Sequence, residues 1–428
     1  MILSNVSVPL LGIVDTAVMG HLESPTYLGA VAIGSAIFAF LYTGMNFLRM
    51  GTTGIAAQRF GAEDFDGLRT SLGQALIVSL AIALVLIVLQ MPIGSLGLDL
   101  LGGDEMTRVH ADTYFSVRIW SAPGTLANYV LIGWFLGLQN ARVPLAIFLT
   151  INITNIVLDL LFVIVLGMKV EGVALASVIA EYTALLVGLA FAVRALRQHA
   201  GRWNLSRLTN LSAYRAFFFV NGNLFIRTMA LIFALAFVTA QGARLGPSIL
   251  AANAVLMNFQ HLTSFGLDGI AHAAEALVGK AAGRKDDAAL RQTVSLTLKW
   301  SLIFALGITA AYIIAGPLII GLLTDLPEVR ATAMTYLPWL IASPLISVWC
   351  FLYDGVYVGM TRSREMRNVM LISTFLVFLP VWFVTQGFEN HGLWFAFLAF
   401  LAARGIGMHF GYRKSMRVPL GPDITKRA

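Results

Sequence analysis

The chain has 428 residues, of which 58% are apolar and 12% are charged. A water-soluble protein carries about 25% charged residues, so no soluble fold could bury this much apolar surface and the bilayer must act as part of the solvent. The net charge of +7 does not indicate nucleic-acid binding, because the basic residues lie in short connections between apolar runs. The single cysteine, Cys350, excludes a disulfide framework and a cysteine-based metal cluster within the chain.

Twelve apolar runs follow one another along the chain, each long enough to cross a bilayer as a helix. They cover residues 1–20, 27–57, 70–97, 112–138, 143–167, 171–195, 216–242, 248–281, 290–323, 331–360, 366–386 and 391–412. A β-barrel would need an apolar–polar alternation of period two, and none is present. No cleavable signal peptide is visible before the first run. The sequence therefore predicts an all-α membrane protein with twelve transmembrane helices.

The distribution of lysine and arginine predicts the orientation of these helices. Of the 29 basic residues, 20 fall on one side of the predicted membrane, 4 on the other side and 5 within spans. Positively charged loops stay in the cytoplasm, so we expect both termini to be cytoplasmic and the chain to lie in a bacterial inner membrane. We expect a monomer that contacts the lipid bilayer and small organic molecules, but no nucleic acid.

The two halves of the chain repeat each other. At one constant offset, four glycines of the first half coincide with four of the second: Gly20 with Gly242, Gly61 with Gly283, Gly133 with Gly355, and Gly137 with Gly359. The repeat predicts two pseudo-symmetric six-helix lobes around a central cleft, an architecture that suits alternating access. We expect a first lobe at residues 1–195, a cytoplasmic linker at 196–215, a second lobe at 216–412 and a cytoplasmic tail at 413–428.

Acidic residues inside the predicted spans are the candidates for function, because a charge at the bilayer centre costs about 2.5–3.5 kcal/mol on insertion scales. Asn152, Asn155 and Asp159 fall on one helical face, and Asp15 lies in the first span. Two acids in one dry pocket cannot both stay ionised, so such a pocket takes up a proton near neutral pH. Alternatively, Asp15, Asn155 and Asp159 could hold Na⁺ through hard oxygen ligands, or form a packing network that does not titrate.

Further charges lie in the second half of the chain. Asp268 and Glu275 share a face of the eighth span, and Asp354 lies in the tenth. Arg49 and Arg227 are the internal cations that could neutralise such acids. These residues therefore predict either a substrate cavity or structural ion pairs. The same alternative stays open for Glu181, and three bulky side chains are weak candidates for packing on flat cationic compounds: Trp134, Phe237 and Met257.

The chain resembles the multidrug and toxic compound extrusion (MATE) family, and within it the DinF-like branch. The matching segments keep their order over essentially the whole chain and cover residues 8–22, 48–58, 155–159, 251–256 and 267–276. The resemblance implies two six-helix lobes and export against a proton or sodium gradient. It also implies a first-lobe cavity that contains Asp15, Asn155, Asp159 and a hydroxyl at Ser177, where relatives usually carry threonine.

We therefore expect a secondary active exporter that moves organic, often cationic, compounds outward in exchange for protons and binds no cofactor. Coupling to Na⁺ is the close alternative. A lipid-linked oligosaccharide flippase is a further one, although it would need a more basic cavity than five Lys and Arg residues within spans provide. An intramembrane enzyme is not expected, because no His-Glu-x-x-His motif occurs and the seven histidines are scattered.

Overall fold

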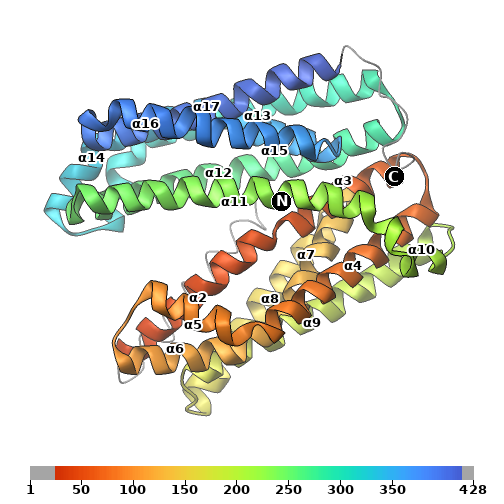
Figure 1. Cartoon of the computed structure of the whole chain (residues 1–428), viewed down its shortest axis with the longest axis horizontal. Helices are drawn as coiled ribbons and strands as arrows, with labels where there is room; N and C mark the ends of the chain where they lie inside the picture. The colour runs from red at the N-terminus through yellow and green to blue at the C-terminus, as the bar shows by residue number, and fades with distance from the viewer. Residues whose placement is uncertain (1–24, 417–428) are drawn as a thin grey trace. The chain divides into compact units, whose positions relative to one another are not determined.

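A computed structural model describes residues 25–416, and every regular element in that range is helical (Figure 1). The chain separates into two compact units that divide between Phe217 and Phe218. The predicted all-α fold is therefore confirmed for the described range. The predicted first span at 1–20 and the end of the predicted tail, residues 417–428, lie outside the described residues.

The helices of the first unit correspond to five of the predicted spans. They are α2 (Pro25–Met45), α3 (Phe47–Gly61), α4 (Phe65–Val88), α5 (Gln90–Leu101), α6 (Glu105–Arg118), η1 (Ile119–Ser121), α7 (Ala122–Gly137), α8 (Arg142–Asp159), η2 (Leu160–Val165) and α9 (Val170–Gln198). Three of the apolar runs are broken into two helices each, at Asn46, at Leu89 and at the 3₁₀ turn η1. Helix α7 is the centre of the unit, because fourteen of its sixteen residues are buried and it packs against α3, α4 and α9.

The second unit is built around α14. Its elements are α11 (Arg215–Leu245), α12 (Pro247–Gly283), α13 (Asp287–Leu323), α14 (Pro327–Gly359), α15 (Ser363–Ile372), η4 (Ser373–Phe378), α16 (Leu379–Thr385), η5 (Gln386–Phe388) and α17 (Glu389–Ser415). Helix α14 packs against α12, α13 and α17. At about 1.5 Å per residue, α12 and α13 are longer than the hydrocarbon core is thick, as the long apolar runs predict.

A segment of short helices joins the two units. Helix α10 (Leu205–Thr209) and the 3₁₀ turn η3 (Leu211–Tyr214) lie in the predicted linker and pack beside α4. Gln74 of α4 donates from Nε2 to the carbonyl oxygens of Arg207 and Ala213 at 3.2 and 3.3 Å. These bonds attach the segment to the first unit.

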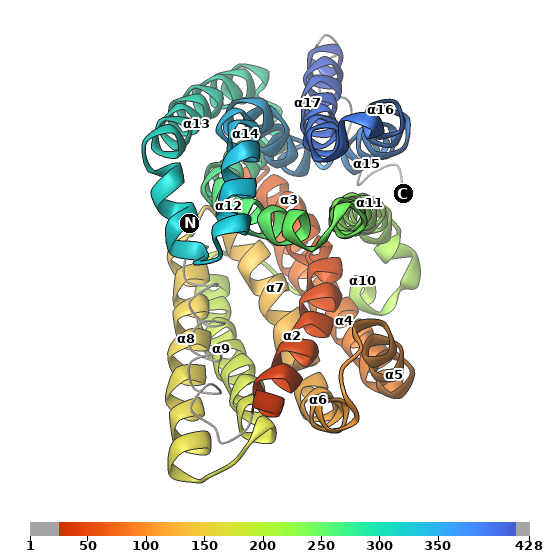
Figure 2. The same cartoon turned by 90° about the vertical axis from the view of Figure 1, so that its left-hand side faces the viewer.

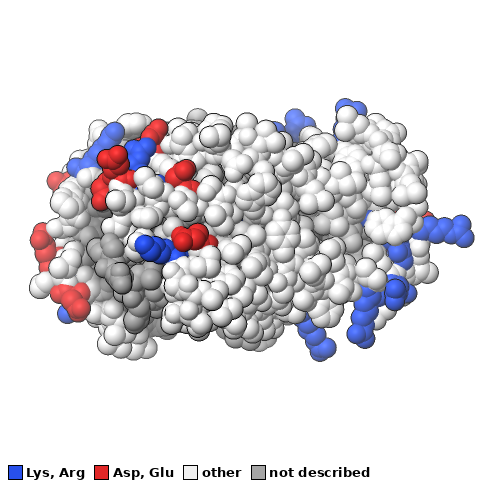
Figure 3. All heavy atoms as spheres, turned by 90° about the horizontal axis from the view of Figure 1, so that it is seen from below, with Lys and Arg blue, Asp and Glu red and all other residues white. Residues whose placement is uncertain are grey.

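Eight helical segments of the described range are long and apolar enough to cross a membrane. Helices α7 and α12 are not among them; α7 has sixteen residues, and fourteen of these are buried in protein. On the face in Figure 3, charged side chains gather towards the two ends, and an uncharged band lies between them, as a bilayer-facing surface requires.

The internal repeat has a structural counterpart at the α3–α7 and α12–α14 crossings. A Cβ atom on Gly133 would lie 2.3 Å from the carbonyl oxygen of Arg49, and one on Gly355 would lie 2.3 Å from the carbonyl oxygen of Ala271. Arg49 and Ala271 are themselves related by the offset that relates the two glycines. One turn later, Gly137 and Gly359 make similarly close contacts with the same partner helices. Both units are therefore held by the same glycine-dependent contact between helix backbones.

The connections repeat as well. In the turn after α3, Glu63 has a φ of 56° and the carboxylate of Asp64 accepts from the Gly67 amide at 2.8 Å. In the turn after α12, Lys285 has a φ of 56° and Asp286 accepts from the Ala289 amide at 2.9 Å. These aspartates cap the first free N–H groups of α4 and α13. The offset of the sequence repeat thus joins positions with the same backbone conformation.

Gly355→Ala should destabilise the protein by about 1–3 kcal/mol, because the new methyl group overlaps a main-chain carbonyl that cannot move alone. The melting temperature of the purified protein in detergent measures this. Gly307→Ala is the matched control, because a Cβ there has no neighbour within 4 Å and alanine favours the helix. Equal stability of the two variants would contradict the role given to the α12–α14 contact.

Candidate functional site

The first candidate site lies between α8 and α9, which run side by side (Figures 1 and 2). Asn155 and Asp159 of α8 are fully buried, and Ser177 of α9 is buried opposite them. Asn155 donates from Nδ2 to Ser177 Oγ at 3.2 Å. The predicted polar face of α8 is therefore real, with Asn152 at its half-buried end. Asp15, the other acid predicted for this site, lies outside the described residues.

The backbone changes its geometry directly after Asp159. Helix α8 ends at this residue and continues as the wider π-helix η2. Short π-helical stretches inside longer helices are often found at functional sites, because they shift the register of the side chains that follow. Asp159 thus lies at an irregular point of an otherwise apolar helix.

The second unit contains a buried cluster of three charges. Asp354 of α14 accepts through Oδ2 from both Arg227 of α11 and Arg404 of α17, the latter at 2.7 Å. The three side chains are between 3% and 12% exposed. Removing one member of such a cluster leaves an uncompensated buried charge. The sequence predicted either a substrate cavity or structural ion pairs for Asp354 and Arg227. The arrangement in the structure is that of an ion pair.

Arg404 is a residue whose role the sequence reasoning missed. It was visible as a charge within the last apolar run, but sequence spacing does not reveal that α17 packs on α14 beside Asp354. Arg404 also lies near Asp268 of α12, close enough for their charges to attract. Asp268 is half-buried, whereas Glu275 is buried near Gly359 at the α12–α14 crossing.

The remaining predicted positions are spread over the first unit. Arg49 of α3 is half-buried and donates from Nε to Asn46 Oδ1 at 3.1 Å. Glu181 of α9 lies one turn after Ser177, but its amide partner is Asn128 of α7. Trp134 is fully buried and donates from Nε1 to the Leu68 carbonyl at 3.3 Å. Trp134 therefore packs in the core of the first unit, and its ring is not exposed for the contact with flat cationic compounds that the sequence suggested.

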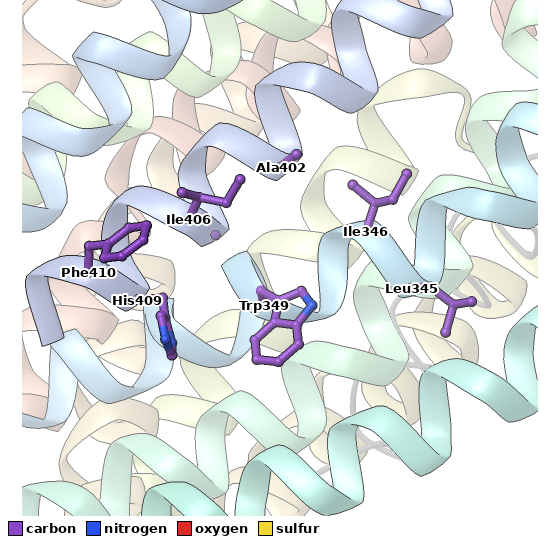
Figure 4. A pocket seen from close by; sticks show the side chains of 8 residues that line it. Leu345, Ile346, Trp349, Ala402, Ile406, His409 and Phe410 are labelled. Carbon is purple, nitrogen blue, oxygen red and sulfur yellow. The ribbon is translucent and has the colours of Figure 1, made fainter. Parts of the chain in front are cut away.

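An apolar cavity of about 420 Å³ lies between α14 and α17 (Figure 4). Its lining includes Trp349, Ile406, His409 and Phe410. None of the predicted site residues lines it, and Ile406 and Phe410 are largely exposed. No cluster of three or more His, Cys, Asp or Glu residues that could hold a metal ion occurs between residues 25 and 416.

Comparisons with known proteins agree with this architecture. The family described as MatE matches residues 1–161 and 223–384. The chain belongs to the MATE family. It is 40% identical over 417 residues to the DNA damage-inducible protein F of Escherichia coli, covering 97% of this chain and 91% of that relative. This similarity confirms the DinF-like resemblance.

More distant relatives share the fold. The chain is 23% identical over 434 residues to a probable multidrug resistance protein NorM of Bacillus subtilis, covering 96% of this chain and 93% of that protein. The crystal structure of a MATE protein in a bent conformation superposes with a TM-score of 0.88 at 18% identity, covering 97% of this chain and 94% of the other. The chain is therefore a multi-pass, ion-coupled membrane transporter of small organic molecules, and not an enzyme.

Asp354→Asn should lower the stability of this MATE protein by about 3–5 kcal/mol, because two buried arginines lose their shared anion. Thermal unfolding of the purified variant measures the change. Asp325→Asn is the control, because Asp325 is fully exposed and lies 3.6 Å from Arg330, so no measurable change is expected. If Asp354→Asn kept its stability but lost transport, Asp354 would be a transport residue instead.

Proposed function

We propose that this protein is a proton-driven antiporter that exports organic, often cationic, compounds. The observation that carries the proposal is the buried site of Asn155, Asp159 and Ser177 between α8 and α9. A carboxylic acid in a dry environment favours its neutral form, so a buried Asp159 can bind and release a proton as access to the site changes. Asp15 is the second acid of the proposed coupling pair.

The proposed cycle uses alternating access. In the outward-facing state, the Asp15/Asp159 pair takes up a proton, the site rearranges and the exported compound leaves. In the inward-facing state, the proton is released and a new compound binds. Asn152, Asp268 and Glu275 complete the proposed substrate cavity, whereas Asp354, Arg227 and Arg404 support its framework through their ion pairs.

The same oxygens also support the alternative of Na⁺ coupling. Asp15, Asn155 and Asp159, with Ser177, offer the carboxylate, amide and hydroxyl oxygens that hard cations prefer. The flippase alternative is less well supported. Two of its basic candidates, Arg227 and Arg404, both pair with Asp354 and are therefore not available to a pyrophosphate group.

We further propose that the chain crosses the bacterial inner membrane twelve times with both termini in the cytoplasm. The proposed lobes are residues 1–195 and 216–412, joined by a linker at 196–215 and followed by a tail at 413–428, around a central cleft. The two repeated helix crossings support two equivalent lobes. We propose that the protein acts as a monomer, with one pair of lobes.

Asp159→Asn should abolish efflux of a fluorescent cationic dye from proteoliposomes driven by a pH gradient, because the amide cannot exchange a proton. Asp15→Asn should have the same effect. Asp99→Asn serves as the control, because Asp99 is exposed and pairs with Arg108. If dye movement required a sodium gradient instead of a pH gradient, the coupling ion would be Na⁺ and not the proton. Retained proton-driven transport in Asp159→Asn would contradict the coupling site.

A further inference from the structure

The apolar cavity between α14 and α17 is a groove on the surface of the second unit (Figure 4). Ile406 and Phe410, on its α17 side, are 57% and 66% exposed. Both helices belong to segments that are long and apolar enough to cross a membrane. Exposed apolar side chains of such segments contact lipid acyl chains. The groove therefore opens to the bilayer.

The hollow between the two helices exists because small residues of α17 lie opposite a large residue of α14. A Cβ atom on Gly405 would lie 2.8 Å from Trp349 Cβ, so the helices are in contact there. Ala402, one turn earlier, lines the hollow beside this contact. Because close packing fixes both walls, the groove is a preformed concave apolar surface of the size that holds a small ligand or part of a larger one.

The α17 side of the groove continues into basic residues. Ala402, Ile406, His409 and Arg413 recur at intervals of three and four residues, so they lie along one face of the helix. From Ala402 to Arg413 this face extends for about 16 Å, which is about the thickness of the hydrocarbon layer of one leaflet. Arg413 and Lys414 lie in the last turn of α17 and are exposed. The groove thus leads from an apolar interior to a positively charged end.

Aromatic residues mark the level at which the groove reaches the membrane surface. The Tyr353 hydroxyl lies 2.6 Å from Nδ1 of His409, and the rings of Tyr353 and Tyr412 lie with their centroids 5.7 Å apart. Tyrosine and tryptophan are enriched where acyl chains meet headgroups. Arg413 lies near both Tyr353 and His409, close enough for its charge to act on them. Arg413 is therefore placed at the depth of the lipid headgroups.

The charge at this end of the groove is positive. Within residues 25–416, Arg413 and Lys414 take part in no ion pair. Arg291 and Asp287 of α13 both lie near Tyr412, where their opposite charges offset each other. Basic residues at the cytoplasmic end of a membrane helix attract anionic lipids, and this end of α17 is cytoplasmic in the orientation proposed above. An anionic headgroup matches the charge, and an acyl chain matches the apolar hollow.

We propose that the groove binds a single anionic glycerophospholipid of the cytoplasmic leaflet. One acyl chain fills the hollow over Trp349, and the phosphate is bound by Arg413 and Lys414. The lipid also stabilises the second unit, because it lies against both α14 and α17, the helices that carry the Asp354–Arg404 ion pair. The proposal uses the orientation proposed above and does not depend on antiport.

Quenching of Trp349 fluorescence by brominated acyl chains tests this proposal without any transport. The purified protein is placed in phosphatidylcholine nanodiscs that contain a rising fraction of brominated phosphatidylglycerol, and the contribution of Trp349 is the difference from Trp349→Phe. Quenching of Trp349 should saturate at a low fraction of this anionic lipid and should require a fraction of brominated phosphatidylcholine that is about fivefold higher or more. Equal quenching by the two lipids, or quenching that rises without saturation, would overturn the site.

Arg413→Gln separates the headgroup contact from the apolar contact. Each basic residue near the membrane surface strengthens the binding of an anionic lipid about fivefold, so the preference for phosphatidylglycerol should fall by about that factor. Arg244→Gln is the matched control, because Arg244 is an exposed arginine in the last turn of α11 and does not line the groove. This control should leave the preference unchanged. An unchanged preference in Arg413→Gln would contradict the proposed headgroup contact.

Ala402→Phe tests the hollow itself, because the new ring occupies the space of the acyl chain. Saturable quenching of Trp349 should be lost, whereas Ala190→Phe, which adds the same ring at an exposed alanine of α9, should keep it. Saturable quenching that survives in a folded Ala402→Phe variant would overturn the groove as the binding site. If this variant does not fold, Arg413→Gln still decides.

Thermal unfolding gives a second measurement. The unchanged protein should melt at a higher temperature with phosphatidylglycerol than with phosphatidylcholine, because a ligand that binds only the folded state stabilises it, and Arg413→Gln should reduce this difference. An equal melting temperature in both lipids would contradict the stabilising role. Protection of Trp349 from quenching by the cationic dye would assign the groove to the exported compound and would overturn the lipid site.

Discussion

Contact between helix backbones, made at two glycines per unit, is the constraint on which the rest of the molecule depends. At Gly133 and Gly355 any side chain would meet a main-chain carbonyl oxygen at 2.3 Å, so α3 and α7, and likewise α12 and α14, approach too closely to leave room for a side chain at either position. Such contacts hold helices together in a bilayer, where apolar side chains gain nothing by leaving lipid. The other helices of each unit pack around these pairs. The two glycine contacts therefore also help to position the helices that carry the buried polar residues.

This repeated framework carries different chemistry in its two copies. At the offset that relates Gly133 to Gly355, Asp159 corresponds to Val381 and Asp354 corresponds to Ile132. Glu181 is bonded by a neutral amide and Asp159 shares a buried face with Asn155, whereas Asp354 is bonded by two arginines. Asp354 cannot take up a proton without leaving two buried arginines uncompensated. This difference is the reason for placing ion coupling in the first unit.

The fold was predictable from the sequence to a large extent, because each membrane helix is a local property of about 20 consecutive residues. The repeat was equally legible, since Gly61, Gly133 and their partners recur at one spacing. The breaks at Asn46 and Leu89 were not, because the apolar run continues through them. Of the site, the shared face of Asn155 and Asp159 followed from helical periodicity, whereas the partners on other helices did not. Neither Arg404 beside Asp354 nor Asn128 beside Glu181 is marked by any spacing along the chain.

The sequence by itself determined the class of the protein, the course of its membrane helices, the twofold repeat and which buried positions carry charge. All of these depend on composition and on intervals within one helix or one repeat. Only the tertiary structure decided which partners the buried charges of the described residues have, because that depends on which side chain a neighbouring helix brings within hydrogen-bonding distance. The packing of α17 on α14 makes Asp354 part of an ion-paired framework, and the packing of α7 on α9 brings the amide of Asn128 to the Glu181 carboxylate.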